Sequence, residues 1–447
     1  MFSLAKSLFK IHRSITGKGF NTSLDIVLNH AMGGGSACFL KPQTYKNAKN
    51  FRFYEIKLEI SNVKSGTKIY DWVVPNEWEI DDAFIITPSG KKICDFKRLN
   101  LHVLGYSEAV DKFLSLDELK THLYTLPDLP NAVPYATSYY ERRWGFCIAK
   151  NELDTLETGT YHAVIKSSFK KDGHLRYARI FIPATQKTDE TILISTYLCH
   201  PQMANNELSG PVVWANLVRF VRGLNTRRYN YEFVITPETI GSICYIHENF
   251  SRLKQNVKGG FVLTCIGDER EYSLVLSPNE QRLSDKIALH TIKHRTNKPK
   301  IYSFKERGSD ERQYNTPALD LGVVALSRSK FGEYKEYHTS LDDFSVVTKN
   351  GLNGGFLYAR NCILNLETNA KFVLNTICEP NLGKRGLIRT LSLGKNHEAQ
   401  MILRNFLAFC DGKNDTLKIA EILGVELYKL RPIIEVLLKN NLIKEIK

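Results

Sequence analysis

The chain has 447 residues, 43% of them hydrophobic and 11% aromatic, which is enough apolar material for two or three domains with large cores. Charged or polar residues interrupt every apolar run before the roughly 18 residues that a membrane-spanning helix needs, which excludes a membrane protein. The net charge of +14 is spread along the chain, and the nine cysteines show no paired spacing. We therefore expect a cytoplasmic protein without a disulfide framework or a concentrated nucleic-acid-binding surface.

The first 121 residues divide into a helical start and a strand-rich stretch. The N-terminal MFSLAKSLFKIHRSITGKG is basic and amphipathic, as transit peptides are, but its apolar spacing favours the first helix of a domain. From about residue 56 the pattern changes to short alternating segments such as AFIITPSGKKICDF, with a Pro-Ser-Gly turn at 88–90. We predict a β-rich subdomain at 56–121, inserted into a larger domain made of residues 1–55 and 122–375.

Strand and helix patterns alternate between about residues 190 and 370. Continuous apolar runs such as TILISTYL and YEFVITP are followed by the helix-like GPVVWANLVRFVRGL and IGSICYIHENFSRL. This alternation predicts an α/β fold with a mixed, mostly parallel sheet and helices on both faces. Ligands bind beyond the carboxyl ends of the strands in such sheets, so the residues directly after each strand are candidates for the functional site.

The C-terminal stretch predicts a winged-helix domain at 376–447. After a helix that ends near Cys410, TLKIAEILG and ELYKLRPIIEVLLKNNLI form two helices around a glycine turn, and the strand-like LIKEI follows. Asp415 or Thr416 is the expected N-cap of the middle helix.

Such a domain can place a recognition helix in the major groove of DNA. The basic candidates here are Lys429, Arg431 and Lys439. These charges are few, and Pro432 falls early in the helix, where base-reading side chains would lie. A protein contact or domain packing is therefore favoured over nucleic acid, although nucleic-acid binding stays open.

Four ionisable residues follow the predicted core strands: His200, Glu238, Asp268 and His338. Two imidazoles and two carboxylates are ligand types that Zn²⁺ prefers, and an open position leaves room for a polarised water. Each alone could be structural, for example as a hydrogen-bonded histidine or an acid near a helix N-terminus. Because all four fall on the same side of one predicted sheet, we predict a metal site there.

The motifs CHPQMANNELSG, PETIGS, CIGDE, RGSDERQY and GEYKEYHTSLDD occur in this order, after a β-rich insertion and before a winged helix. This order resembles the aminopeptidase-like family often encoded with bacterial polysaccharide-biosynthesis genes, and it covers nearly the whole chain. That family is similar to the di-zinc aminopeptidases, the clan of bacterial leucyl aminopeptidases. The resemblance implies a metal-dependent hydrolase whose substrate is a small amide or peptide.

The resemblance also implies roles for single residues. In the clan a carboxylate and a water bridge two zinc ions, and a glutamate takes the proton of the water as it attacks a peptide carbonyl. His200 and His338 match ligands of the two metals, Asn206 matches the bridging carboxylate, and Asp268 lies near the third acidic position. Glu238 lies in the glutamate motif and is the expected catalytic residue as well as a metal ligand.

Two departures from the clan bear on the metal centre. Asn206 offers a neutral carbonyl oxygen, which is a poor bridge between two cations, and the neighbouring Glu207 would have to point the opposite way to replace it. Pro237 stands beside Glu238 where the clan tends to have a second glutamate, so one side chain would serve as both base and ligand. We expect one zinc ion or an unequal pair.

Other acidic residues are alternative ligands. Matching the glycine of TCIGD would place Thr264 at the ligand position instead of Asp268, and Asp310 and Asp342 are further candidates. Asp310 could instead join Arg307, Glu311 and Arg312 in a charge network that holds a substrate carboxylate.

Further roles concern residues around the metal site. Asp342 and Asp343 could orient His338 through its other ring nitrogen. Tyr314 and Tyr337 could donate to a developing oxyanion, although a core or surface role suits a tyrosine equally.

Three functions remain open on the sequence alone. The first is the metal-dependent hydrolase, the second is a non-catalytic binding or scaffold protein that keeps the fold, and the third is a regulator that uses the winged helix on nucleic acid. The expected partners are a small substrate, a protein that contacts the winged helix, and a second copy of the chain in a homo-oligomer.

Overall fold

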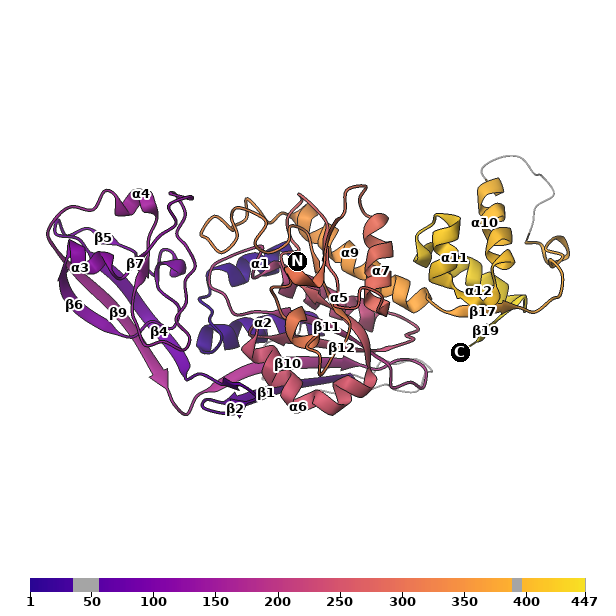
Figure 1. Ribbon diagram of the computed structural model, residues 1–447, viewed down its shortest axis with the longest axis horizontal. Coiled ribbons are helices and arrows are strands. Elements are labelled where there is room, and N and C mark those ends of the chain that lie inside the picture. The colour runs from indigo at the N-terminus through magenta and orange to yellow at the C-terminus, as the bar shows by residue number, and fades with distance from the viewer. Residues whose placement is uncertain (35–55, 388–395, 447) are drawn as a thin grey trace. The chain divides into compact units, whose positions relative to one another are not determined.

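The computed structural model describes residues 1–34, 56–387 and 396–446 (Figure 1). The chain forms two compact units, the first made of Met1–Asp285 with Lys300–Phe356 and the second of Lys286–Pro299 with Leu357–Lys447. Part of the predicted segment 1–55 lies outside the described residues. Among the residues described, no helix combines the length and apolarity that crossing a membrane requires.

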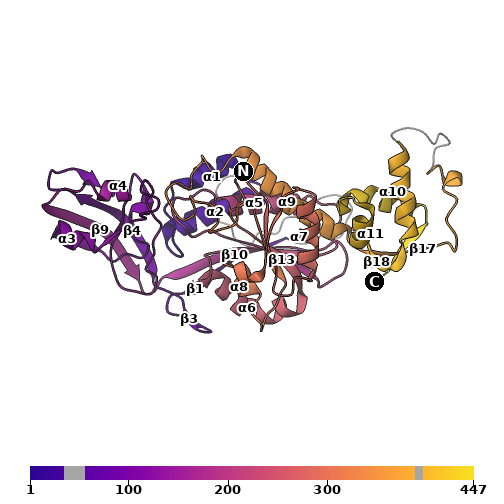
Figure 2. The same cartoon turned by 45° about the horizontal axis from the view of Figure 1, so that its top comes forward.

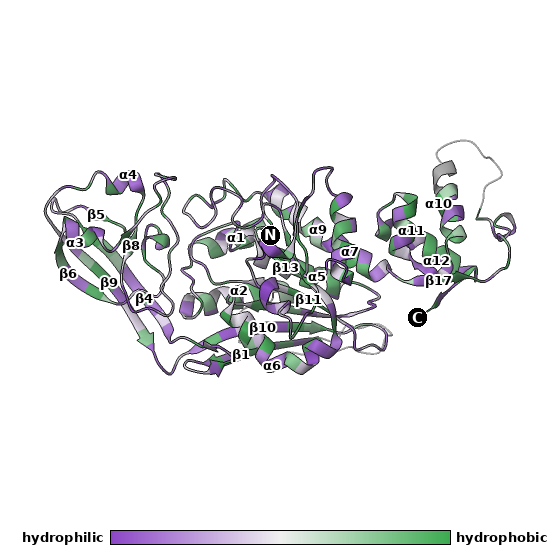
Figure 3. Ribbon diagram, viewed as in Figure 1, coloured by the Kyte–Doolittle hydropathy of each residue, from purple (hydrophilic) through white to green (hydrophobic). Residues whose placement is uncertain are grey.

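The core of the first unit is an eight-stranded sheet in the order β1-β10-β12-β11-β13-β16-β14-β15. Neighbouring strands are parallel from β12 to β16, while β1, β10 and β14 run antiparallel to a neighbour. Every residue of β11 and β12 is buried, which explains why most of their residues are apolar (Figure 3). The strands are β1 (Lys57–Lys64), β10 (His174–Ile182), β11 (Thr191–Tyr197), β12 (Asn230–Thr236), β13 (Val257–Leu263), β14 (Ser273–Val275), β15 (Lys300–Tyr302) and β16 (Val323–Ser327).

Helices cover both faces of this sheet. Figure 2 shows α1, α2 and α5 on one face and α6 with α8 on the other. The predicted fold class, mixed α/β with a mostly parallel sheet, is therefore confirmed. The helices are α1 (Phe2–Phe9), α2 (Lys18–Met32), α5 (Ser209–Arg222), α6 (Ile240–Asn256) and α8 (Glu311–Tyr314), while α7 (Leu283–Lys293) and α9 (Lys349–Thr368) are divided between the two units.

A smaller antiparallel sheet in the first unit has the order β5-β4-β9-β6, and one face covers a hydrophobic cluster that includes Ala83, Ile85 and Tyr161. The predicted range 56–121 does not match this pairing, because β1 lies in the large sheet and β9 in the small one. Alternating strands look alike in sequence, and only their long-range partners distinguish them. The remaining elements are β2 (Lys68–Ile69), β3 (Trp72–Val73), β4 (Glu77–Ile86), β5 (Lys92–Ile93), β6 (Val110–Ser115), α3 (Leu116–Lys120), β7 (Leu123–Tyr124), β8 (Phe146–Cys147), α4 (Lys150–Leu153) and β9 (Thr160–Lys170).

The second unit contains the winged helix, a three-stranded antiparallel sheet β18-β17-β19 with three helices. Of the two predicted N-caps, Asp415 caps α11, since its Oδ1 accepts from the Lys418 amide at 2.8 Å. Pro432 lies in the first turn of α12, where its missing N–H costs no hydrogen bond. The elements are β17 (Lys371–Leu374), α10 (Asn396–Ala408), β18 (Asp411–Asp415), α11 (Thr416–Leu423), α12 (Arg431–Lys439) and β19 (Ile443–Ile446), so the first strand precedes the predicted boundary at 376.

Candidate metal centre

The candidate site lies at the carboxyl ends of the parallel strands of the large sheet. His200 follows β11 by three residues, and Glu238 follows β12 by two. Asp268 follows β13, and His338 lies in the loop after β16. Because β11, β12, β13 and β16 are parallel, all four residues start from the same edge of the sheet.

Three of these residues, His200, Glu238 and His338, lie close together. Its Nε2 lies 3.7 Å from Oε2 of Glu238, and its ring centroid lies 5.3 Å from that of His338. The backbone of His338 has φ 56°, and its ring stacks on Tyr337 at 3.9 Å between centroids. The ring of Tyr135 packs against both histidines. Its centroid lies 5.0 Å from that of His200 and 5.1 Å from that of His338. Within the described residues, the buried Nε2 of His338 has no hydrogen-bond partner.

Asn206 presents an unused oxygen in the same loop as His200. Its backbone amide donates to Oδ2 of Asp342 at 2.8 Å, and its side-chain Nδ2 donates to the hydroxyl of Tyr197 at 3.0 Å. The Oδ1 atom is buried and has no hydrogen-bond partner among the described residues. A buried oxygen in this state costs free energy unless a ligand contacts it, so Asn206 suits a neutral metal ligand.

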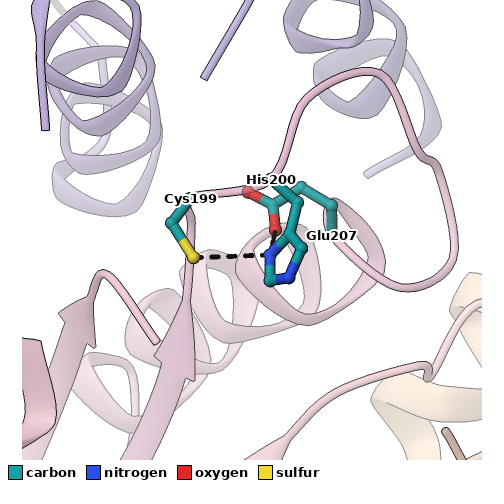
Figure 4. A group of neighbouring side chains, drawn as sticks. All are labelled: Cys199, His200 and Glu207. Atoms are coloured by element: carbon teal, nitrogen blue, oxygen red, sulfur yellow. Dashed lines mark hydrogen bonds and ion pairs between the residues drawn. The ribbon is translucent and has the colours of Figure 1, made fainter. Parts of the chain in front are cut away.

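Cys199, His200 and Glu207 form a second group of potential ligands, shown in Figure 4. His200 Nδ1 lies 3.0 Å from Oε2 of Glu207 and 3.3 Å from Sγ of Cys199. The buried guanidinium of Arg13 lies 3.4 Å from the other oxygen of Glu207 and would repel a cation. Burial also raises the pKa of the Cys199 thiol well above its usual value, so the thiolate that metals bind is disfavoured. We therefore interpret Cys199 and Glu207 as residues that hold the ring of His200 in place and not as metal ligands.

Asp268 does not join the histidines, because hydrogen bonds from the protein use both of its oxygens. Oδ2 accepts from Asn205 Nδ2 at 3.1 Å and from the Ser329 amide at 2.9 Å. Oδ1 accepts from the Ser329 hydroxyl at 2.8 Å and from the Arg270 amide at 2.9 Å. Four donors satisfy the carboxylate and tie three loops together, so we interpret Asp268 as a structural residue.

The alternative acids also have structural partners. Asp342 accepts from the amides of Asn205 and Asn206 at 2.6 and 2.8 Å, and Asp343 accepts from the Ser345 amide at 2.7 Å. They hold the loops around the site, and within the described residues neither aspartate makes a hydrogen bond to His338. Their role in orienting His338 stays a prediction.

Asp310 anchors the turn that carries Glu238. Its Oδ1 accepts from the Thr239 amide at 2.8 Å and from the Ser242 hydroxyl at 2.9 Å. The preceding Ser309 donates to Oε1 of Glu238 at 2.9 Å. The segment RGSDERQY therefore positions the expected catalytic residue, a role that spacing alone did not reveal.

The electrostatics of the site favour a bound cation. Burial lowers the pKa of His200 and of His338 to about 3, which leaves both imidazoles neutral with a lone pair for a metal. Burial, together with the charge of Asp310, raises the pKa of Glu238 to about 8. A divalent cation would stabilise the ionised carboxylate. Two neutral imidazoles and a carboxylate are ligand types that zinc prefers, but among the described His, Cys, Asp and Glu residues it is Cys199, His200 and Glu207 whose ligand atoms all lie within 4.8 Å of one another.

Two residues near the site were not identified from the sequence. Arg13 lies in a basic N-terminal stretch, and Tyr135 is one of 21 tyrosines, so neither carries a local signal. Of the two predicted oxyanion donors, Tyr337 stacks on His338, whereas the Tyr314 hydroxyl is buried and bonds Ser195 at 2.9 Å. Tyr314 is thus a core residue.

Known families and structures match nearly the whole chain. Residues 45–369 match a domain of unknown function, DUF4910, and residues 371–445 match a winged helix-turn-helix. A Clostridium acetobutylicum protein named "Putative polysaccharide biosynthesis protein with aminopeptidase-like domain" is 37% identical, over 99% of this chain and 96% of its own length.

Two solved structures have a similar fold. A crystal structure described as "putative peptidase" from Clostridium acetobutylicum has a TM-score of 0.87 at 36% identity, over 100% of this chain and 96% of that chain. The zinc aminopeptidase BSAP from Bacillus subtilis has a TM-score of 0.52 at 13% identity, over 80% of this chain and 92% of that chain. At that identity the second similarity concerns the fold alone. Arg13 lies before the residues that match the DUF4910 family.

Proposed function

This chain belongs to the DUF4910 family of aminopeptidase-like proteins with a C-terminal winged helix, and we propose that it is a zinc-dependent hydrolase of amide or peptide bonds. One observation carries the proposal. Nε2 of His338 and Oδ1 of Asn206 are buried without a hydrogen-bond partner in the described residues, and Nε2 of His200 faces the carboxylate of Glu238. Unused lone pairs at the carboxyl edge of a parallel sheet are what a metal site requires.

His200, His338, Glu238 and Asn206 would hold the metal. When bound, zinc supplies Lewis-acid polarisation of a water molecule and of an amide carbonyl. Glu238 would be the proton acceptor, since Ser309 donates to Oε1 and leaves Oε2 directed at His200. The side chain of Glu238 is 20% exposed and within reach of solvent, whereas that of His200 is only 5% exposed.

We propose a single zinc ion rather than a pair. A second divalent cation needs a carboxylate bridge and acidic ligands of its own. Asn206 supplies no negative charge at the bridging position, and Asp268 already accepts four hydrogen bonds. The donors that would hold a second ion are therefore engaged elsewhere.

The substrate we propose is an amide-bearing sugar or a small peptide. The name of the Clostridium relative refers to polysaccharide biosynthesis, which favours the sugar. A cavity of about 210 Å³ offers a place for its ring, since Tyr139, Tyr140 and Phe169 line it together with Asn76 and Arg142. The Tyr139 hydroxyl lies 2.8 Å from that of Tyr135, which packs on both histidines.

The eight cysteines that the structure describes are free, in accord with a cytoplasmic location.

Metal analysis of the purified protein tests the proposal. We expect about one equivalent of zinc per chain, and we expect His200→Ala and His338→Ala each to lose it. His162→Ala is the matched control, because this histidine pairs with Asp111 on the small sheet at 2.6 Å. A protein that binds no zinc, or that keeps it after His200→Ala, would refute the site.

A second candidate function is a non-catalytic binding protein, which the neutral Asn206 favours. Such a protein would have the same fold and would bind zinc as the proposed hydrolase does, but it would not hydrolyse amides. A panel of sugar amides and amino-acid amides separates the two, because hydrolysis that is lost in Glu238→Gln supports the enzyme. Bound zinc without turnover of any amide would support the binding protein.

A further inference from the structure

Exposed aromatic side chains gather at one place in the first unit. Four aromatic side chains are exposed among the described residues, and three of them are Tyr70, Trp72 and Tyr140. The first two belong to the hairpin of β2 and β3, which lies beside β1 in Figures 1 and 2. The ring centroid of Tyr140 lies 6.1 Å from that of Trp72, and its hydroxyl donates to the carbonyl oxygen of the exposed Val73 at 3.2 Å. We call Tyr70, Trp72, Val73 and Tyr140 the aromatic surface.

The aromatic surface continues into the cavity of about 210 Å³ described above. Val73 and Tyr140 belong to both, because they also line the cavity. Two polar side chains line it as well. Asn76 makes no side-chain hydrogen bond within the described residues, and the guanidinium of Arg142 lies over the ring of Phe169 at 4.1 Å from its centroid. The cavity therefore combines aromatic rings with donors and acceptors that a ligand can use.

This combination suits a carbohydrate better than a protein partner. The C–H groups on one side of a sugar ring carry a weak positive charge and pack on the negative face of an aromatic ring, while the hydroxyls need hydrogen-bond partners. The rings of Trp72 and Tyr140 supply the first contact, and Asn76 and Arg142 supply the second. A stable protein interface buries roughly 800 Å² on each partner, which is far more than four partly exposed side chains provide.

The cavity also connects the aromatic surface with the candidate metal centre. Tyr139 lines the cavity, and its hydroxyl lies 2.8 Å from that of Tyr135. The ring of Tyr135 packs against those of His200 and His338. A ligand ring in the cavity would therefore have the candidate centre on one side and the aromatic surface on the other.

We propose that the aromatic surface and the cavity bind a chain of sugar units, so that the amide-bearing sugar belongs to an oligosaccharide and not to a free monosaccharide. The cavity takes one unit, and the rings of Trp72 and Tyr140 stack on its neighbours. That the bound chain is the substrate rests on the proposed function. The binding of the chain itself needs no metal.

Isothermal titration calorimetry with N-acetylglucosamine and its β-1,4-linked dimer and hexamer tests the proposal, since every unit of these probes carries an amide. The full-length protein is titrated as purified and again after treatment with a chelator. We expect the affinity to rise from the monosaccharide to the hexamer in both preparations. Trp72→Ala and Tyr140→Ala should each weaken binding of the hexamer roughly tenfold, the order of magnitude of one aromatic contact.

Two control variants separate stacking from other effects. Phe113→Ala removes the fourth exposed aromatic side chain, which stacks on His162 at 4.3 Å between centroids and does not line the cavity, so it should leave binding unchanged. Tyr140→Phe removes the hydrogen bond to Val73 but keeps the ring. It should bind the hexamer as the wild type does, whereas Tyr140→Ala should not.

Several outcomes would overturn the proposal. They are an absence of binding for all three probes, a hexamer that binds no more tightly than the monosaccharide, and equal losses in Trp72→Ala and Phe113→Ala. Sedimentation analysis tests a different occupant, because a wild-type dimer that becomes a monomer in Trp72→Ala would assign the aromatic surface to an interface between copies of the chain.

The same measurements keep this proposal distinct from the proposed function. Bound zinc and amide hydrolysis in a protein that binds no sugar oligomer would overturn the sugar site and leave the hydrolase intact. Length-dependent binding in a protein that holds no zinc would support the sugar site and refute the metal centre.

Discussion

Glu238 and His200 face each other across the ends of two neighbouring parallel strands, with 3.7 Å between Oε2 and Nε2. Ser309 holds the other oxygen of Glu238, and Glu207 holds the other nitrogen of His200. Each of the two groups therefore has one atom bonded to the protein and one atom directed at the other. This is the arrangement that a metal-binding histidine and a catalytic glutamate share.

Asn206→Asp should restore the missing charge at the bridging position. The substitution keeps the shape of the side chain and places a carboxylate where Oδ1 is now buried without a partner in the described residues. We expect the zinc content to rise from about one toward about two equivalents. Metal analysis measures this, with Asn216→Asp as a control on α5, away from the site. A content that stays at about one equivalent would show that the neutral amide does not limit the number of ions.

Asp268→Ala should destabilise the protein without removing zinc. The substitution leaves the donors from Asn205, Ser329 and Arg270 without their acceptor in a buried place, so we expect a loss of about 3 kcal/mol in the free energy of unfolding. Denaturant unfolding measures the loss, and metal analysis of the folded variant measures the zinc. Loss of zinc at unchanged stability would instead make Asp268 a ligand.

Gly210→Ala should disturb the start of α5. A Cβ atom at this position would lie 2.4 Å from the carbonyl oxygen of Leu263 and 2.5 Å from the hydroxyl of Thr196, so the helix would have to move off the sheet. We expect a loss of about 2 kcal/mol in unfolding free energy. Gly223→Ala at the other end of α5 is the control, because its new methyl would meet nothing nearer than 3.4 Å. Equal losses in the two variants would contradict this explanation.

The stability of the second unit should depend on His290 in acid. Burial lowers the pKa of His290 to about 4, and its Nε2 accepts from the Leu427 amide at 2.9 Å. The unfolded chain takes up the proton first, near its ordinary pKa of about 6.5. The stabilisation is therefore complete above about pH 6.5 and is lost as the pH falls through about 4.

The variant His290→Gln tests this dependence. Glutamine keeps an acceptor for the Leu427 amide but does not titrate. Between about pH 7 and 4, the wild type should lose about 2 kcal/mol more unfolding free energy than the variant does, as followed by urea denaturation. An identical pH dependence in the two proteins would remove His290 as the cause.

The winged helix should bind nucleic acid weakly. The helix α12 exposes Val436 and Leu438 at 37% and 41% together with the acidic Glu435, which suits a protein contact better than a phosphate backbone. In a mobility-shift assay with random duplex DNA, we expect no retained complex at about 150 mM salt. A complex whose affinity falls steeply with salt would support the nucleic-acid function instead.

The sequence predicted which residues meet at the strand ends better than it predicted their partners. His200 and Glu238 could be identified because parallel strands end at one edge, so residues after different strands meet there. Asp268 follows a strand in the same way, but its carboxylate accepts N–H and O–H groups from loops that lie far apart in sequence. In the sequence, an acidic residue after a strand looks the same whether its carboxylate binds a cation or accepts hydrogen bonds from N–H and O–H groups.

Contacts between distant segments account for what the sequence did not reveal. The bond from Arg13 to the His200 carbonyl oxygen joins residues 187 positions apart, and no periodicity or spacing rule reaches that far. The sequence also did not reveal that β1 belongs to the large sheet and β9 to the small one. The sheet to which a strand belongs depends on its partner, and β1 pairs with the distant β10 and β9 with the distant β4. The helices α11 and α12 could be predicted because their apolar periodicity and capping residues are local, whereas β17 pairs with the distant β19 and lay outside the predicted boundary.

The distance along the chain between Arg13, His200 and His338 also has a consequence during synthesis. The arginine leaves the ribosome first, and His338 follows only after three quarters of the chain has been made. Until then the loop of His200 has a histidine but lacks the second imidazole. Under the proposed function, a nascent chain would therefore have no complete set of ligands for zinc, and metal uptake would be deferred until the large sheet has closed.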